Sequence, residues 1–169
     1  MRIAVAADHA GFERKNEVAD ALRALGHDVS DLGTYDTRPV DYPDFAEALG
    51  LAIMKGRAER GVLVCGSGVG AAVAINKMPG IRASICHDSY SAHQGVEHDD
   101  MNVLVLGGRV VGPEVAKELA RVFAAARFSG EERHLRRLAK MRAIEERYEG
   151  AGREGDLAAE GPGSEETLP

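Results

Sequence analysis

A cysteine followed directly by a glycine-rich loop is the feature of this chain best suited to do chemistry. Cys65 ends the apolar run 62–65, and the loop after it consists of Gly66, Ser67, Gly68, Val69 and Gly70. Such a loop, between a buried strand and a helix, gathers free backbone N–H donors in front of the positive end of the helix dipole. A neighbouring thiol is then favoured as its thiolate. The segment therefore offers a candidate base and a place for developing negative charge.

Other interpretations of this segment stay open. A free cysteine at a strand end is more often a small apolar core residue than a reactive group. The loop differs from the dinucleotide fingerprint, because glycine occupies every second position and the loop follows the third predicted strand. It also lacks the Lys-Ser/Thr pair of a P-loop. The residues alone thus indicate an anion-binding loop of unspecified use.

Two histidines beside acidic residues are further candidates. Asp8-His9 follows the first predicted strand and is either a charge-oriented imidazole or a turn. His98-Asp99 ends a predicted helix, where a charged imidazole is favoured, although a solvated turn also explains it. His93 and His98 are five residues apart and do not share a helix face well. We therefore expect no metal site.

A pair of arginines and one tyrosine complete the candidates. Arg133 and Arg137 are four residues apart in a predicted helix, so both guanidiniums can project from one face and hold a phosphate. Paired with neighbouring glutamates, they would instead form an ordinary solvated face. Tyr42, directly before Pro43, either lines a pocket or packs in the core.

The elements that position these residues alternate along the chain. Short apolar runs predict strands, while helical spacing, glycine stops and N-terminal prolines predict helices. The predicted strands are 3–7, 27–31, 61–65, 81–86 and 102–106, and the predicted helices are 12–25, 42–55, 70–77, 89–98, 113–127 and 131–148. This alternation predicts an α/β fold with a five-stranded parallel sheet and helices on both faces.

Ligands of such sheets bind outside the carboxyl ends of the strands. We therefore expect one edge of the sheet to gather the residues that follow its strands: Asp8-His9, Cys65 with its loop, His87-Asp88 and Gly107-Gly108-Arg109.

Charge and composition divide the 169 residues into one domain, 1–148, and an acidic tail, 149–169. The tail holds six acidic residues and one basic residue, so the domain carries almost none of the net charge of −6. A nearly neutral domain argues against nucleic-acid binding. The tail is rich in Gly, Glu and Ala, and we expect it to be disordered.

The chain has no feature that directs it to a membrane or out of the cell. No apolar run reaches membrane-span length, and the N-terminus lacks the layout of a signal peptide. Cys65 and Cys86 form no CxxC pair. We expect both to be reduced thiols in a cytoplasmic protein without membrane contact.

Several short motifs occur in a characteristic order and spacing. They are Ala7-Asp8-His9-Ala10-Gly11-Phe12, Asp41-Tyr42-Pro43, Cys65-Gly66-Ser67-Gly68-Val69-Gly70, Ala74-Ile75-Asn76-Lys77, Asn102-Val103-Leu104, Gly108-Arg109-Val110-Val111-Gly112 and Arg133-His134. Together they resemble the type B ribose-5-phosphate isomerases over 1–148. With Cys65 present and Ala71-Ala72 after the loop, the chain resembles the branch that uses a cysteine.

The resemblance implies a Rossmann-like three-layer α/β/α sandwich that requires no metal and no cofactor. It implies an aldose-ketose isomerase that interconverts ribose 5-phosphate and ribulose 5-phosphate through an enediolate. It also implies a homodimer whose active sites are shared between subunits, or a dimer of such dimers.

The resemblance further implies a role for each candidate residue. Cys65 would remove the proton on C2, the backbone amides of 66–70 would hold the enediolate oxygen, and His98 would open the sugar ring. Asp8 would contact the sugar hydroxyls, and Tyr42 is a further substrate-binding candidate. The family's phosphate-binding positions match His9, Arg109, Arg133 and Arg137.

One position departs from the family pattern. The residue after the family's histidine is commonly Asn, whereas this chain has Asp99, and an ionised Asp cannot donate a hydrogen bond. Asp99 therefore either accepts from a sugar hydroxyl or points away. The alternatives are an isomerase of another aldose phosphate, such as a tetrose or hexose phosphate, and a non-catalytic nucleotide- or phosphate-binding module.

Overall fold

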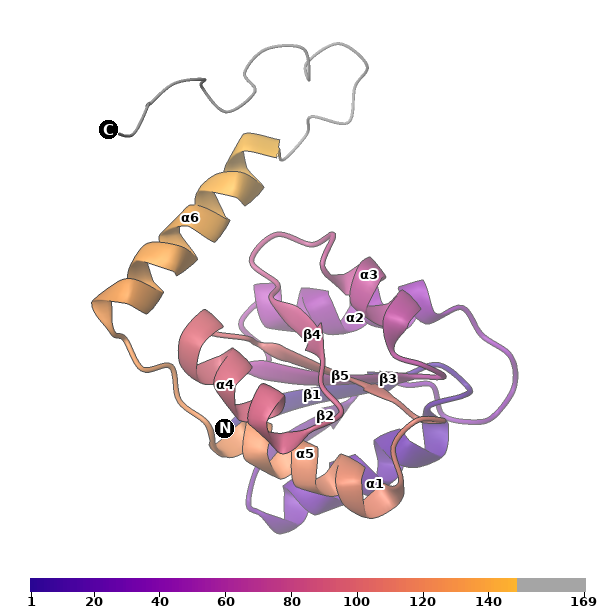
Figure 1. The fold of residues 1–169 in the computed structure, drawn as a ribbon. Coiled ribbons are helices and arrows are strands. Elements are labelled where there is room, and N and C mark those ends of the chain that lie inside the picture. The colour runs from indigo at the N-terminus through magenta and orange to yellow at the C-terminus, as the bar shows by residue number, and fades with distance from the viewer. Residues whose placement is uncertain (149–169) are drawn as a thin grey trace, which may run out of the picture.

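The computed structural model describes residues 1–148; the predicted tail, 149–169, lies outside the described residues. A five-stranded parallel sheet in the order β2-β1-β3-β5-β4 forms the centre of the domain (Figure 1). Its strands are β1 (Arg2–Ala7), β2 (Asp28–Asp31), β3 (Arg60–Cys65), β4 (Ala83–Ile85) and β5 (Val103–Gly107). The helices are α1 (Phe12–Ala24), α2 (Tyr42–Met54), α3 (Val69–Ile75), α4 (Ser89–Asp99), α5 (Pro113–Ala125) and α6 (Glu132–Tyr148). The predicted parallel α/β fold is confirmed.

Alternate residues of the central strands face two separate hydrophobic layers. Val5 and Val64 pack with α1, α4 and α5, whereas Ala6 and Leu63 pack with α2 and α3. Figure 1 shows α1 and α5 on one side of the sheet and α2 and α3 on the other. Helices cover both faces, which is why the central strands are nearly continuous apolar runs.

Local sequence sets where the helices begin and end. Gly26, with φ of 82°, follows α1 as the predicted stop. The N-cap of α4 is Asp88, the residue directly before the helix. An Asp88 carboxylate oxygen accepts the Ser91 N–H at 2.7 Å, and this bond lowers the pKa of the carboxyl group. A carboxylate therefore caps the first turn of α4.

The last helix, α6, leaves the body of the domain next to α4 (Figure 1). Its inner side buries His134 and Leu138, while Arg133 and Arg137 are exposed. Farther along, the Glu145 carboxylate accepts the Gly80 N–H at 2.8 Å. Within 1–148, none of the helices has the length and apolar character needed to cross a membrane.

Candidate functional site

The carboxyl ends of β1, β3 and β5 meet at one edge of the sheet beside a cavity of about 420 Å³. The cavity is lined by Asp8, His9, Ala10, Tyr42, Cys65, Gly66, Ser67, Gly70, Arg109 and Val110. Apart from Ala10 and Val110, all of these are site residues predicted from the sequence. Most of the predicted candidates therefore lie around a single cavity.

Cys65 is the last residue of β3, and its side chain is almost fully buried at the base of this cavity. Its Sγ accepts the Gly68 N–H at 3.1 Å. Its carbonyl oxygen accepts the Gly108 N–H at 2.7 Å, which ties the strand end to the turn after β5. A backbone donor aimed at sulfur stabilises negative charge there, as a thiolate base requires.

The shape of the loop after Cys65 depends on two glycines. Gly68 has φ of 87°, a left-handed conformation that costs glycine little, and α3 begins at the next residue. A Cβ at Gly70 would lie 2.7 Å from Cζ of Tyr42. The tyrosine ring therefore packs directly on the loop backbone, and Tyr42 and the loop line the same cavity.

Asp8 and His9 are held by backbone groups in the turn between β1 and α1. One carboxylate oxygen of Asp8 accepts the N–H groups of Ala10 at 2.9 Å and Gly11 at 3.0 Å, so Asp8 shapes this turn. Nδ1 of His9 accepts the Val40 N–H at 3.2 Å. This acceptor role places the imidazole proton of the neutral side chain on Nε2, which leaves that nitrogen as a donor.

Arg109 and His87 also follow strands, but they have different surroundings. The Arg109 N–H donates to the Gly66 carbonyl oxygen at 3.0 Å, and its exposed side chain lines the cavity. His87 instead uses Nε2 to accept the Gly107 N–H at 3.2 Å. His87 therefore stabilises the start of the turn that follows β5.

Four of the predicted residues, His98, Asp99, Arg133 and Arg137, lie at the other end of the domain. α4 starts at the carboxyl edge after β4 and, at 11 residues, runs back for about 16 Å. Directly after it, the Asp100 carbonyl oxygen accepts from Nε of Arg82, which precedes β4, at 2.7 Å. His98 thus lies near the amino ends of the strands, far from Cys65.

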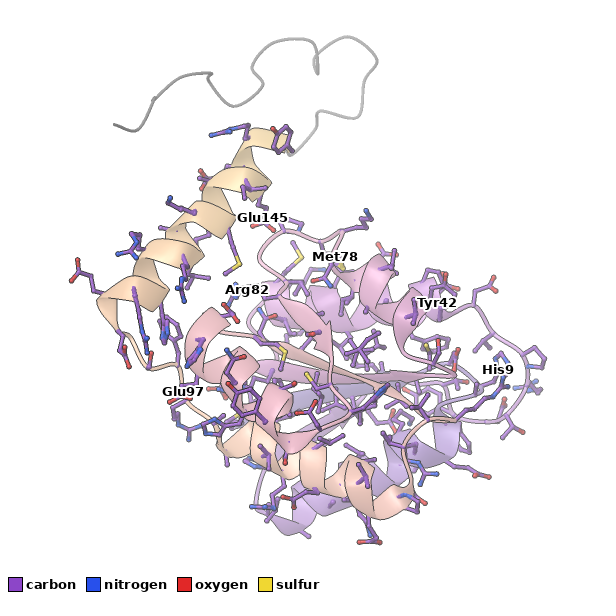
Figure 2. The ribbon with its side chains drawn as sticks, in the orientation of Figure 1. His9, Tyr42, Met78, Arg82, Glu97 and Glu145 are labelled. Atoms are coloured by element: carbon purple, nitrogen blue, oxygen red, sulfur yellow. The ribbon has the colours of Figure 1, made fainter. Side chains whose placement is uncertain are left out.

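Figure 2 shows the same separation. His9 and Tyr42 lie at one end of the molecule, and Glu97, the neighbour of His98, lies at the other. Within a single chain, the cavity around Cys65 does not include His98, Asp99, Arg133 or Arg137.

His98 is fixed by side chains that sequence reasoning did not select. The Gln94 amide lies 2.7 Å from Nδ1 of His98, and the ring of His134 lies against that of His98 with centroids 4.1 Å apart. Nδ1 of His134 is 2.7 Å from the Ser129 hydroxyl. Burial, with the nearby His98 and then Arg133, lowers the pKa of His134. Gln94 could have been selected from the sequence, because it precedes His98 by one helical turn and therefore shares a helix face with it.

The arginines of α6 lie beside this histidine pair. Arg133 donates from Nε to a Glu131 carboxylate oxygen at 2.9 Å, whereas Arg137 is exposed and makes no hydrogen bond or ion pair within residues 1–148. Asp99 lines a separate groove of about 540 Å³ between α4 and α6. In the described part of the chain, no three His, Cys, Asp or Glu side chains are grouped to hold a metal ion.

Comparison with known proteins identifies the family. A family model described as Ribose/Galactose Isomerase matches residues 3–141. Ribose-5-phosphate isomerase B of Escherichia coli (strain K12) is 42% identical over 146 residues, which cover 86% of this chain and 97% of that protein. D-erythrulose-4-phosphate isomerase of Pectobacterium atrosepticum is 42% identical over 133 residues, which cover 77% of this chain and 86% of that protein.

A solved structure agrees with these relatives. Ribose-5-phosphate isomerase B of Clostridium thermocellum superposes with a TM-score of 0.85 and 42% sequence identity, over 88% of this chain and 99% of that chain. The family match takes in both the Cys65 cavity and the arginines of α6. The chain therefore belongs to the ribose/galactose isomerase family.

Proposed function

We propose that this protein interconverts ribose 5-phosphate and ribulose 5-phosphate. One observation carries the proposal: Cys65, the loop residues Gly66, Ser67 and Gly70, and the side chains of His9 and Arg109 line one cavity. This set offers a base, donors for an oxyanion and groups for a remote phosphate. The names of the relatives in Escherichia coli and Clostridium thermocellum support the same reaction.

The reaction moves one proton between adjacent carbons. Cys65, as thiolate, takes the proton from C2 of the open-chain aldose, and the C–H electron pair forms the C1=C2 bond while charge moves to the carbonyl oxygen. The proton then returns from Cys65 to C1 while the hydroxyl proton of O2 is transferred to the charged O1, so that a CH2OH group forms at C1 and a ketone at C2. Backbone N–H groups of 66–70 hold the charged oxygen, and each such donor contributes about 3–4 kcal/mol to lowering the barrier.

The far end of the substrate anchors it. His9 and Arg109 border the cavity, where they can hold the phosphate through charge-assisted hydrogen bonds. Binding energy gained there, away from the reacting carbons, positions C1 and C2 against Cys65. Asp8 retains a carboxylate oxygen that can accept from a sugar hydroxyl, and Tyr42 forms a wall of the cavity.

We further propose that the active enzyme is a homodimer. A five-carbon sugar phosphate is too short to join the Cys65 cavity to His98 across one chain, because the two lie at opposite edges of the sheet. A second copy, related by a two-fold axis, can bring its own His98, Arg133 and Arg137 to the cavity of the first. In that arrangement His98 opens the sugar ring and the arginines complete the phosphate site.

A cytoplasmic location is consistent with this proposal, since the chemistry requires a reduced thiol at Cys65. Both cysteines are free.

A second candidate substrate is a shorter aldose phosphate. Asp99 stands where the family commonly has Asn, and it lies next to the histidine that would act on the sugar ring. The relative from Pectobacterium atrosepticum is named for a four-carbon ketose phosphate. Asp99 would favour a sugar whose hydroxyl can donate to it.

The test is a panel of tetrose, pentose and hexose phosphates assayed with the wild-type protein and with Asp99→Asn. We expect the highest kcat/KM for ribose 5-phosphate. A higher value for a tetrose phosphate would favour the second candidate, especially if Asp99→Asn reversed the ranking. No turnover of any sugar, together with tight nucleotide binding in calorimetry, would instead indicate a non-catalytic module.

A further inference from the structure

A second, smaller cavity adjoins the first on the side away from Cys65. Its volume is about 240 Å³, and its lining residues are His9, Ala10, Glu13, Arg14, Thr37, Gly108 and Arg109. His9, Ala10 and Arg109 line both cavities. A substrate whose reacting carbons lie at Cys65 can therefore extend its other end between His9 and Arg109 into this second space.

Arg14 is the residue that distinguishes the second cavity. It lies in the first turn of α1, and only 16% of its side chain is exposed. Its Nη1 pairs with the Glu17 carboxylate one turn along the helix. Its Nε–H is buried and has no hydrogen-bond partner among the described residues. A buried donor without an acceptor is unfavourable, so this guanidinium is prepared for an acceptor that arrives with a ligand.

The charges around the second cavity favour an anion. Arg14 and Arg109 are cationic, His9 can donate, and the positive end of the α1 dipole lies at the same place. Glu13 is the one carboxylate that lines the cavity, and it is exposed to solvent. A phosphate dianion matches two neighbouring guanidiniums better than a neutral group does.

We propose that Arg14 is a further phosphate-binding residue, which sets the affinity for the phosphate end of the substrate. This rests on the proposed isomerase function and adds to it, because Arg14 lies outside the phosphate-binding set of His9, Arg109, Arg133 and Arg137. The ligand class is a phosphomonoester or inorganic phosphate. On binding, a phosphate oxygen accepts from Arg14, while Arg109 and His9 hold the other oxygens.

The direct experiment compares Arg14→Leu with Arg23→Leu. Arg23 is a matched control, because it lies on the same helix and forms the same kind of pair with Asp20, at 3.0 Å, on the solvent side. We expect Arg14→Leu to raise the Kd of inorganic phosphate and the KM of ribose 5-phosphate about tenfold, the effect of losing one charge-assisted bond. The kcat should remain close to that of the wild type, since Arg14 is remote from the reacting carbons, and Arg23→Leu should change neither constant.

Glu17→Gln separates ligand binding from a structural role. It releases Nη1 of Arg14, so we expect phosphate to bind more tightly, whereas a structural role of the Arg14–Glu17 pair would make Glu17→Gln resemble Arg14→Leu. Arg14→Lys keeps the charge and should lose only part of the affinity, which provides a folded variant if Arg14→Leu does not fold.

The phosphate Kd tests Arg14 independently of turnover. An unchanged Kd in Arg14→Leu would overturn the proposal. A wild-type protein that isomerises no aldose phosphate, but whose phosphate Kd still rises in Arg14→Leu, would refute the isomerase function and leave the role of Arg14 standing.

Discussion

The cavity at Cys65 and the His98 cluster on α4 and α6 are built in different ways. Around Cys65, short turns after parallel strands supply backbone donors, and these turns are tied to one another by hydrogen bonds such as that from Gly108 to Cys65. Around His98, side chains of two helices supply the groups, and both arginines are exposed. The first region contains a thiol and an anion loop with one imidazole and one arginine, and the second contains two stacked imidazoles and two further arginines. In the proposed dimer, two copies of the chain would combine them.

The largest effect should come from the base in the first region. We expect Cys65→Ala to lower kcat for ribose 5-phosphate about a thousandfold or more, because Asp8 and His9, the other groups of the cavity able to accept a proton, have other roles in the proposed mechanism. Substrate binding should change little, since the phosphate contacts remain. Steady-state kinetics with purified protein gives both constants.

Cys86→Ala is the control for this variant. Cys86 is also buried and free, and burial raises the pKa of its thiol, so it is not prepared to act as a base. Its replacement should leave kcat close to wild type. Near-normal turnover in Cys65→Ala would remove Cys65 from the mechanism and return it to the role of a core residue.

A mixture of two inactive variants tests whether the two regions act together across subunits. Cys65→Ala and His98→Asn should each be nearly inactive alone. After unfolding and refolding together, half of the dimers carry one of each chain, and one of their two sites has both groups intact, so about a quarter of wild-type activity should return. If each site belonged to one chain, the mixture would stay inactive.

The same comparison explains what the sequence could predict. The parallel sheet follows from the alternation of apolar strands and helices, and the rule that ligands bind at the carboxyl ends places Asp8, Cys65 and Arg109 together. These positions depend on local order along the chain, which a sequence displays directly. The structure agrees with that convergence.

The sequence could not predict which side chains far apart in the chain come into contact. The hydrogen bond from Val40 to His9 spans 31 residues, and the ring contact between His98 and His134 depends on how α6 meets α4. His87 follows a strand as His9 does, and both rings accept a backbone N–H, yet of the two only His9 lines the cavity. Such choices are made by tertiary packing, which periodicity and spacing do not encode.

A smaller effect should come from Arg137 in the second region, and it should appear in phosphate binding and not in the chemical step. We expect Arg137→Ala to raise KM for ribose 5-phosphate at least about tenfold, because a charge-assisted bond to phosphate contributes about 1.5–3 kcal/mol. The activity on unphosphorylated ribose should be unaffected. An equal loss for both sugars would mean that Arg137 supports the helix and not the phosphate. Lys140→Ala, on an exposed position of α6, is the control.

The histidine pair should make the second region sensitive to acid. Since the pKa of His134 is lowered from its ordinary value of 6.5, the unfolded chain binds a proton that the folded chain does not, and the free energy of unfolding should fall as the pH drops below that value. His134→Phe keeps a ring against His98 and cannot titrate. Its Tm should therefore fall less than that of the wild type between about pH 7.5 and about pH 5.5.

A second histidine contributes to the same dependence. The pKa of His27 is also lowered, by burial and then by the N-terminal ammonium group, so the Tm change should shrink in His134→Phe without vanishing. His27→Asn should remove the other part. An identical pH dependence of Tm in His134→Phe and the wild type would show that packing of His134 against His98 does not disfavour protonation of His134.

The smallest effect should come from the segment beyond both regions. The sequence 150–169 is rich in Gly, Glu and Ala and has little large apolar surface to bury, so we expect its deletion to leave Tm and kcat/KM nearly unchanged. Deletion of 142–169 is the contrasting control, because it also removes Glu145 and its bond to Gly80, and it should lower Tm. A fall in kcat/KM at unchanged Tm after the shorter deletion would mean that the tail reaches the shared site. A fall in Tm would mean that it packs on the domain or on the partner.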